Sequence, residues 1–100
     1  MLLEEALAAD PASASALFGL AQIAARAQDL ARALDLYRRA ADAAGPERWI
    51  AAWSYVRRGN ILEFQGDHAG AQAEWKRVAG LDGDLRGARE VAERALSGGR

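Results

Sequence analysis

The chain has 100 residues, a formal net charge of −1, 51% hydrophobic and 27% charged residues, and no cysteine. This size and balance are typical of one small globular domain, and without cysteine the chain has no disulfide, thiolate metal site or cysteine nucleophile. The slightly acidic charge argues against a broad phosphate-binding surface, so no nucleic-acid partner is expected, and no apolar run is long enough for membrane insertion.

The first element in chain order is a short helix predicted over 2–9, which ends before Asp10-Pro11. Its sequence, MLLEEALAAD, has acids where a secretory signal peptide has a basic region, so the cytoplasm is the expected compartment. So short a helix is marginal alone. Its leucines need a partner face, which would be supplied by the neighbouring helices or by another subunit.

Breaker residues divide the rest of the chain into five further helices. They are predicted at about 12–27, 30–43, 47–65, 68–79 and 85–96, and none has an interior proline. Alanine, the strongest helix former, is the commonest residue and β-branched residues are scarce, so the fold is predicted to be all-α. Asp29, Asp67 and Asp84 directly precede helical patterns, where a carboxylate can accept hydrogen bonds from the free N–H groups of the first turn.

Two stretches of the chain match when one is shifted by 38 positions: LFGLAQIAARAQDLARALDLYRRA (17–40) and YVRRGNILEFQGDHAGAQAEWKRV (55–78). The matched pairs are Ala21 with Gly59, Asp29 with Asp67, Ala33 with Ala71, Tyr37 with Trp75 and Ala40 with Val78. Antiparallel helices approach most closely where neither carries a large side chain, so we expect Gly59 to cross Ala71. Gly66-Asp67 is then the tight turn of this hairpin, and Trp75 packs across the junction with the next helix.

These features resemble the tetratricopeptide repeat, a 34-residue helix–turn–helix unit with small and aromatic residues at set positions. The resemblance is carried by Leu17, Leu20, Ala21, Ala33, Tyr37 and Ala40 in the first copy, and by Tyr55, Gly59, Leu62, Gly66-Asp67, Ala71, Trp75 and Val78 in the second. Two residues depart from the pattern: Arg58 stands where the family prefers leucine, and Ala24 replaces the usual aromatic. The 38-residue spacing indicates an added turn around Pro46.

The resemblance implies a right-handed superhelical stack of antiparallel helix hairpins, an α-solenoid, with a C-terminal capping helix. One domain at 1–97 would contain a half repeat (2–11), two repeats (12–45 and 47–81) and the capping helix (84–97), followed by a flexible tail (98–100). The last helix lacks the family's first-helix pattern, and stacked repeats need a polar cap at their ends. An alanine-rich helical bundle without repeats is the alternative fold.

In this family the first helices of successive repeats line a concave groove that binds peptides or proteins. By register, the groove residues would be Ser15, Phe18, Gln22, Ala25, Arg26, Trp53, Val56, Asn60, Glu63 and Phe64, with Arg57 nearby. The candidate peptide- or protein-binding residues among them are Phe18, Gln22, Arg26, Trp53, Arg57, Asn60 and Phe64. The aromatic rings would supply buried area, the amides would pair with a peptide backbone, and the arginines would hold a carboxylate.

Each of these assignments has a structural alternative. Aromatic residues at helical spacing are also typical of a core, and this applies most to Trp53 because its helix carries the added turn. Asn60 is common at its position in the family and often contacts a peptide backbone, but it could instead bridge adjacent helices.

Other functions lack the residues that they need. The family's clamp for chaperone tails uses lysines where this chain has Phe18 and Val56, so chaperone tails are not expected as ligands. His68 is the only histidine, and the sequence around Gly83 lacks a calcium-loop pattern, so we expect no enzyme, no cofactor and no metal. The predicted function is a non-catalytic scaffold or adaptor that binds a protein or peptide. The alternatives are a self-associating structural module, forming a homo-oligomer, and a regulatory fragment of a larger protein.

Overall fold

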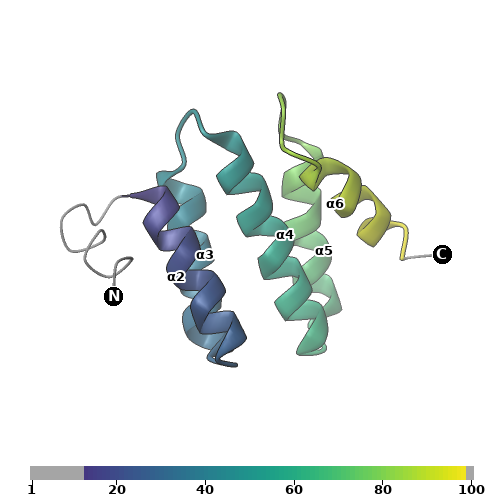
Figure 1. Ribbon diagram of the computed structural model, residues 1–100. Coiled ribbons are helices and arrows are strands. Elements are labelled where there is room, and N and C mark those ends of the chain that lie inside the picture. The colour runs from purple at the N-terminus through teal and green to yellow at the C-terminus, as the bar shows by residue number, and fades with distance from the viewer. Residues whose placement is uncertain (1–12, 99–100) are drawn as a thin grey trace.

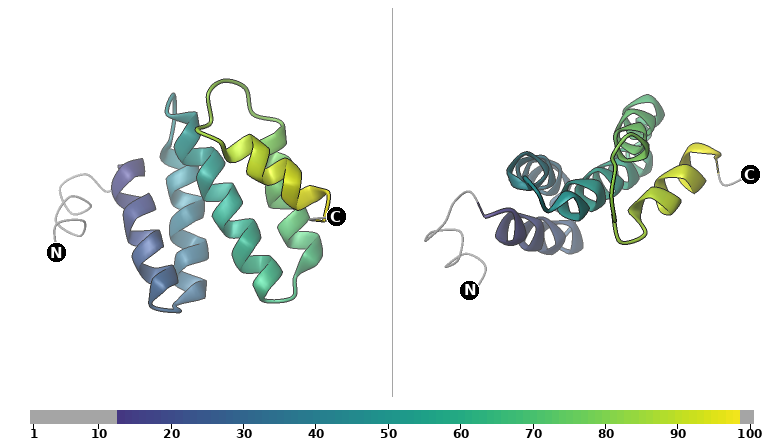
Figure 2. Two further views of the ribbon diagram at one scale, coloured as in Figure 1. Left: turned by 45° about the vertical axis from the view of Figure 1, so that its right-hand side comes forward. Right: turned by 90° about the horizontal axis from the view of Figure 1, so that it is seen from above.

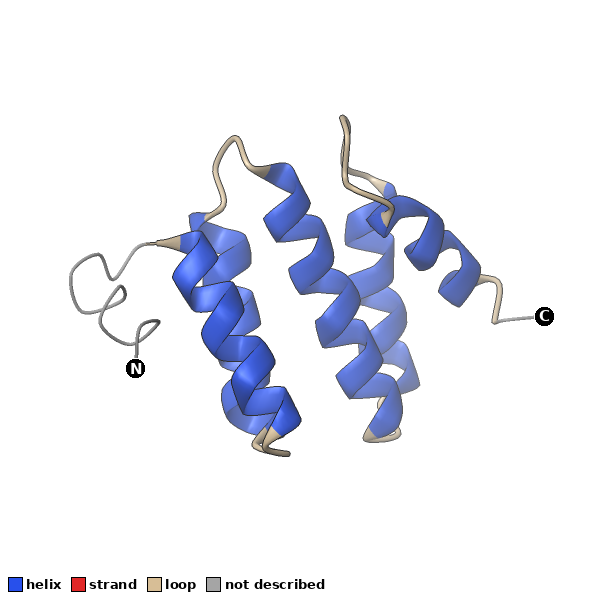
Figure 3. Cartoon of the chain, in the orientation of Figure 1, coloured by secondary structure: helices blue, strands red, loops and turns tan. Residues whose placement is uncertain are grey.

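The computed structural model of the chain describes residues 13–98, and these fold entirely as helices and connecting turns (Figure 3). The helices are α2 (Ala14–Arg26), α3 (Leu30–Ala43), α4 (Arg48–Phe64), α5 (His68–Ala79) and α6 (Ala88–Leu96). The all-α prediction is therefore confirmed for this part of the chain, and four of the five helices lie within two residues of their predicted bounds. The predicted half repeat at 2–11 lies outside the described residues.

The helices pack in chain order, each against the next, and α4 also touches α2 and α6 (Figures 1 and 2). In Figure 1, α2 and α4 lie side by side in front and run in the same direction, while α3 and α5 lie behind them. The principal extents are 43, 30 and 16 Å, and the smallest of these fits two layers of helices packed 8–10 Å apart. The pairs thus spread sideways and leave α2 and α4 on a common face.

Aspartates begin the second helix of each pair. The Asp29 side chain accepts a hydrogen bond from the Arg32 N–H at 3.4 Å, and the Asp67 side chain accepts one from the Gly70 N–H at 2.9 Å. Both predicted caps are confirmed, and each satisfies an N–H group that the helix cannot pair itself. The residue before each cap has a positive φ, 65° at Gln28 and 87° at Gly66, which reverses the chain within a short turn.

The last helix begins later than predicted, at Ala88 instead of residue 85. Arg86 and Gly87 have φ values of 54° and 88°, in the left-handed region, so a right-handed helix cannot run through them. Asp84 was predicted to cap this helix, but its carboxylate accepts a hydrogen bond from the nearby Arg86 N–H at 3.0 Å. Gly87 occupies the capping position without a side-chain hydrogen bond.

The core has two hydrophobic clusters, one centred on α2 and α3 and the other on α4, α5 and α6. Residues that the 38-position shift relates are buried in both. Ala33 and Ala71 are fully buried, as are Ala40 and Val78, and the large rings of Tyr37 and Trp75 are 2% and 6% exposed. The two helix pairs therefore bury corresponding small and aromatic positions.

Gly59 makes room for an indole ring. A Cβ atom added at Gly59 would lie 2.6 Å from Cδ1 and 2.8 Å from Cε2 of Trp75. The close crossing of Gly59 with Ala71 stays a prediction: the atoms that meet Gly59 most closely belong to Trp75, one turn further along α5. Gly59 is small because Trp75 is large, and the two residues form one packing unit.

Candidate binding pocket between α2 and α4

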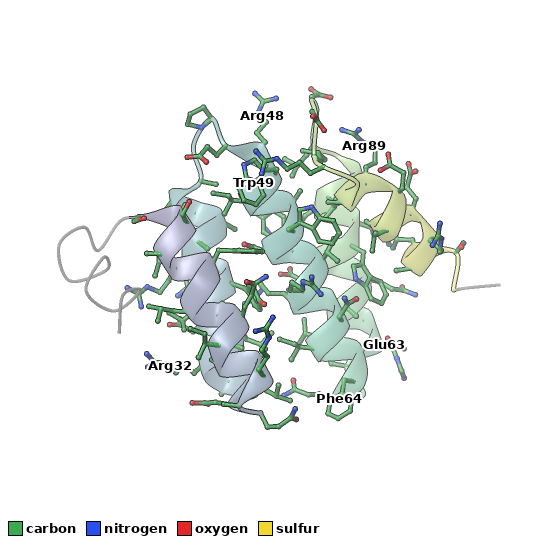
Figure 4. The ribbon with its side chains drawn as sticks, viewed as in Figure 1. Arg32, Arg48, Trp49, Glu63, Phe64 and Arg89 are labelled. Atoms are coloured by element: carbon green, nitrogen blue, oxygen red, sulfur yellow. The ribbon has the colours of Figure 1, made fainter. Side chains whose placement is uncertain are left out.

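A cavity of about 360 Å³ opens between α2 and α4 near their C-terminal ends. Its lining comprises Gln22, Ala25, Arg26, Gln28, Leu30, Tyr37, Arg57, Asn60, Ile61 and Phe64, and we call it the α2–α4 pocket. Five of the seven candidate binding residues meet here: Gln22, Arg26, Arg57, Asn60 and Phe64. Figure 4 shows Phe64 at the lower end of α4.

Helical spacing brings these side chains to one face of each helix. On α4 the lining residues stand at intervals of three and four: Arg57, Asn60, Ile61 and Phe64. On α2 they follow the same spacing: Gln22, Ala25 and Arg26. Residues three and four apart lie on one side of an α-helix, and the two helices lie side by side in parallel (Figure 1). Each helix thus supplies one wall.

Tyr37 of α3 belongs both to the pocket lining and to the first core cluster, and it is 2% exposed. Burial raises the pKa of the Tyr37 hydroxyl above its ordinary value of 10.0, while the positive charges of Arg57 and Arg26 act in the opposite direction. The hydroxyl is therefore protonated at neutral pH and can donate a hydrogen bond. Both guanidinium groups therefore lie close enough to the hydroxyl to act on its pKa.

The lining contains two arginines and no acidic residue. Within residues 13–98, neither Arg26 nor Arg57 has a carboxylate oxygen within 4 Å. The Arg57 guanidinium lies over the Trp53 ring, 5.5 Å from its centroid, and this contact leaves its N–H groups without a carboxylate partner. The pocket is thus a locally positive site on a chain whose net charge is −1.

Phe64 is the most exposed large hydrophobic residue among residues 13–98, with 78% of its surface accessible. The other large hydrophobic residue exposed in this range is Ile23, at 38%, and it does not line the pocket. Single exposed apolar residues are common on protein surfaces. Phe64 differs because it lines the same pocket as the apolar residues Leu30 and Ile61.

Phe18 was predicted to face the groove, but it does not line the pocket. Its ring packs edge-on against Tyr37, with centroids 5.6 Å apart, and against Trp49, at 6.1 Å. It is a partly buried residue of the first core cluster. Phe18 is therefore not part of the pocket lining, and its contact with a partner stays a prediction.

Trp53 is also outside the pocket. It packs partly buried against the second core cluster, and its Nε1–H donates a hydrogen bond to the Arg86 carbonyl at 3.2 Å. The Arg86 guanidinium in turn lies 4.0 Å from the centroid of the Trp49 ring. The α5–α6 loop thus reaches back over α4 and engages the tryptophans near its N-terminal end. Figure 4 labels one of them, Trp49, at the opposite end of α4 from Phe64.

Three further groove predictions have mixed outcomes. Val56 is wrong as a groove residue, because it is 1% exposed within the second core cluster. Ser15 and Glu63 are exposed but do not line the pocket.

Sequence reasoning missed Gln28, Leu30, Tyr37 and Ile61, which complete the lining. Gln28 and Leu30 flank the predicted cap Asp29, so a pocket placed at the end of α2 would have included them.

No group of three His, Asp or Glu side chains in residues 13–98 is close enough to hold a metal ion. Across the same residues, each helix is too short or too polar to cross a bilayer.

Comparison of the chain with known family models, curated proteins and solved structures yields no match. The functional argument therefore depends on the pocket's own chemistry. Cations, amide groups and apolar carbons converge there, and groups of these kinds can contact a ligand through charge, hydrogen bonds and buried area.

Proposed function

We propose that the chain is a non-catalytic binding module, and that the α2–α4 pocket holds a segment of a partner protein or peptide. The observation that carries this proposal is the convergence of five candidate residues from two helices around one cavity with Phe64 exposed at its rim. The lining offers hydrogen-bonding groups, two cations and apolar carbons, which suit a peptide better than covalent chemistry.

The pocket's size and chemistry fit one or two side chains of a peptide. Its volume of about 360 Å³ lies at the small end of the range for ligand pockets. The amides of Gln22, Gln28 and Asn60 can each donate to and accept from a peptide backbone, while Leu30, Ile61 and Phe64 offer apolar area to a side chain. A bound segment would thus make both backbone and side-chain contacts.

The fold that best accommodates this function is a short stack of tetratricopeptide-like hairpins, α2–α3 followed by α4–α5. The equal burial of Ala33 and Ala71, and the matched caps at Asp29 and Asp67, support this interpretation. In such a stack the first helix of each hairpin lies on the binding face. The pocket is formed by those helices, α2 and α4, with Tyr37 and Leu30 contributed by α3.

Peptide display against the full chain, with two pairs of matched variants, tests the binding function. A library of random heptapeptides would be selected on the wild-type chain, and the enriched peptides measured against Phe64→Ala and Asn60→Ala. Both substitutions are expected to weaken binding at least fivefold. Ile23→Ala and Gln65→Ala remove the same kinds of exposed side chain outside the pocket and are expected to have no effect. Unchanged binding by Phe64→Ala and Asn60→Ala would show that the pocket is not the binding site.

Self-association is the second candidate function, and the exposed Phe64 ring favours it because a second copy could cover that ring. A stable dimer buries roughly 800 Å² on each partner. Light scattering over a range of concentrations separates the two functions: a monomer at high concentration removes the dimer, and a dimer that Phe64→Ala dissociates replaces the peptide as occupant of the pocket.

A further inference from the structure

In the described part of the chain, the two pocket arginines lack the carboxylate partners that Arg38 and Arg58 have. Arg38 pairs with Asp35 and Asp42, and Arg58 pairs with Glu74. Arg26 and Arg57 have no carboxylate within 4 Å in residues 13–98. They come from different helices to the same cavity, although like charges that share a site repel each other.

We infer that the α2–α4 pocket selects its partner segment through a carboxylate, an Asp or Glu side chain that lies between Arg26 and Arg57 beside the Tyr37 hydroxyl. This inference rests on the proposed binding function and specifies the ligand's chemistry. A carboxylate there would neutralise both arginines at once. It would also accept charge-assisted hydrogen bonds from the guanidinium groups and a further one from Tyr37.

Core packing holds Tyr37 in a fixed position in this site. It is 2% exposed, and its ring packs against Phe18, so its position is held by the core. A tyrosine hydroxyl is protonated at neutral pH, so it can donate a hydrogen bond to a carboxylate. The flexible arginine side chains can then close around an anion that the tyrosine positions.

The lining sets the spacing between the carboxylate and an apolar residue of the ligand. On α4 it continues beyond Arg57 for two turns, through Asn60 to Phe64, a rise of roughly 10 Å at 1.5 Å per residue. An extended peptide covers that distance in about three residues. The expected ligand therefore carries an Asp or Glu about three residues from a large apolar residue, which would lie against Leu30, Ile61 and Phe64.

The first part of the test identifies the peptide chemistry without a free carboxyl terminus. The random heptapeptides in the library would be flanked on both sides by fixed Gly-Ser segments and selected on the full chain. The enriched sequences are expected to share an acidic residue about three positions from Leu, Ile or Phe. One such peptide would then be made with an acetylated N-terminus and an amidated C-terminus, and its Kd measured by fluorescence polarisation at low and high salt.

A double-mutant cycle then locates the carboxylate. Replacing the peptide's Glu by Gln is expected to weaken binding to the wild-type chain about tenfold, and Arg57→Gln or Arg26→Gln to weaken binding of the Glu peptide similarly. Against either variant the Glu-to-Gln change in the peptide should have a much smaller effect, because the partner charge is already gone. Arg94→Gln on α6 changes the net charge equally, lies outside the pocket and is expected to leave Kd unchanged.

The outcomes separate this inference from the binding function. If peptides bind through Phe64 but their Kd does not change on Glu-to-Gln replacement, the pocket does not recognise a carboxylate. The proposed binding function would still stand. Binding that requires a free carboxyl terminus overturns the assignment to a side chain. A single-stranded oligonucleotide that binds more tightly than the peptide, and is lost with Arg26→Gln, overturns the assignment to a peptide. If no peptide is enriched either from this library or from one whose peptides end in a free carboxyl terminus, both proposals fail.

Discussion

Arg58 of α4 and Glu74 of α5 form an ion pair where the two helix pairs meet. The Arg58 Nε lies against Glu74 Oε1, and its Nη1 donates a hydrogen bond to the Leu34 carbonyl of α3 at 2.5 Å. Arg77 contacts the other Glu74 oxygen at 3.1 Å. Because the Glu74 side chain is only 8% exposed, these arginines provide its charge compensation. One guanidinium thus links three helices.

Arg58→Met is expected to lower the free energy of unfolding by about 2–3 kcal/mol, because it leaves a buried carboxylate with one partner fewer. The remaining contact with Arg77 keeps the loss below that of an isolated buried charge. Urea denaturation followed by circular dichroism measures it. Arg38→Met is the matched control: Arg38 pairs with Asp35 and Asp42 but is 54% exposed, so its loss should stay below about 0.5 kcal/mol. Equal losses would show that the Arg58 pair has no special role.

Gly59→Ala is expected to destabilise the chain, although alanine is the better helix former. Helix propensity alone predicts a gain of about 1 kcal/mol. The added methyl would clash with the buried Trp75 indole, and overpacking costs about 1–3 kcal/mol, so the net result should be a loss of up to about 2 kcal/mol by chemical denaturation.

Gly80→Ala is the matched control for this clash. Its φ is −87°, and an added Cβ meets backbone oxygens at no less than 3.7 Å. Alanine fits there without strain, so this variant should be as stable as the wild type or slightly more so. A stabilised Gly59→Ala variant would mean that Trp75 does not occupy the space above residue 59.

The sequence predicted the helices well because their ends depend on local chemistry. Asp29 and Asp67 cap their helices through hydrogen bonds to residues three positions on, which sequence spacing alone determines. The predicted start of α6 was wrong because Arg86 adopts a left-handed φ, and an arginine in the sequence does not indicate that conformation. Its backbone is held by a hydrogen bond to Trp53, a residue 33 positions away.

The candidate site was predicted in part for the same reason. Helical register on α2 and α4 suffices to bring Gln22 and Asn60 to a common face, and the structure places both in the pocket. Register cannot show which aromatic ring another segment covers. Phe18 and Trp53 share that face but are engaged by Trp49 and Arg86, and these contacts depend on tertiary packing.

His68 is expected to titrate above its ordinary pKa of 6.5. The main cause is its hydrogen bond to Glu63, 2.7 Å from Nδ1, followed by the attraction of the Glu63 charge. Because the pKa of His68 is raised in the folded state, its pairing with Glu63 stabilises the fold. This contribution is fully present below pH 6.5 and is lost as the pH rises through the folded-state pKa. NMR titration of the imidazole measures the pKa. In Glu63→Gln it should fall towards the ordinary value, and an unchanged pKa would contradict the pairing.

The contact of Arg86 with Trp49 and Trp53 should hold the α5–α6 loop in place. The left-handed φ of Arg86 costs roughly 1–2 kcal/mol, so contacts made by this residue must offset it. Its guanidinium lies over Trp49 and its carbonyl accepts the Trp53 hydrogen bond. Arg86→Ala removes the cation–π contact and is expected to lower the free energy of unfolding by about 1 kcal/mol.

The same variant should change the local environment of the two tryptophans. With the guanidinium gone, the loop opens more often, so hydrogen exchange at the Trp53 indole N–H and at loop amides should accelerate. Arg94→Ala, an exposed arginine on α6, is the control and should leave these rates unchanged. Arg86→Gly separates strain from contact: glycine adopts this φ freely, so its stability should exceed that of Arg86→Ala while its indole exchange stays fast. Slow exchange in both variants would show that the Trp53 hydrogen bond holds the loop without the arginine.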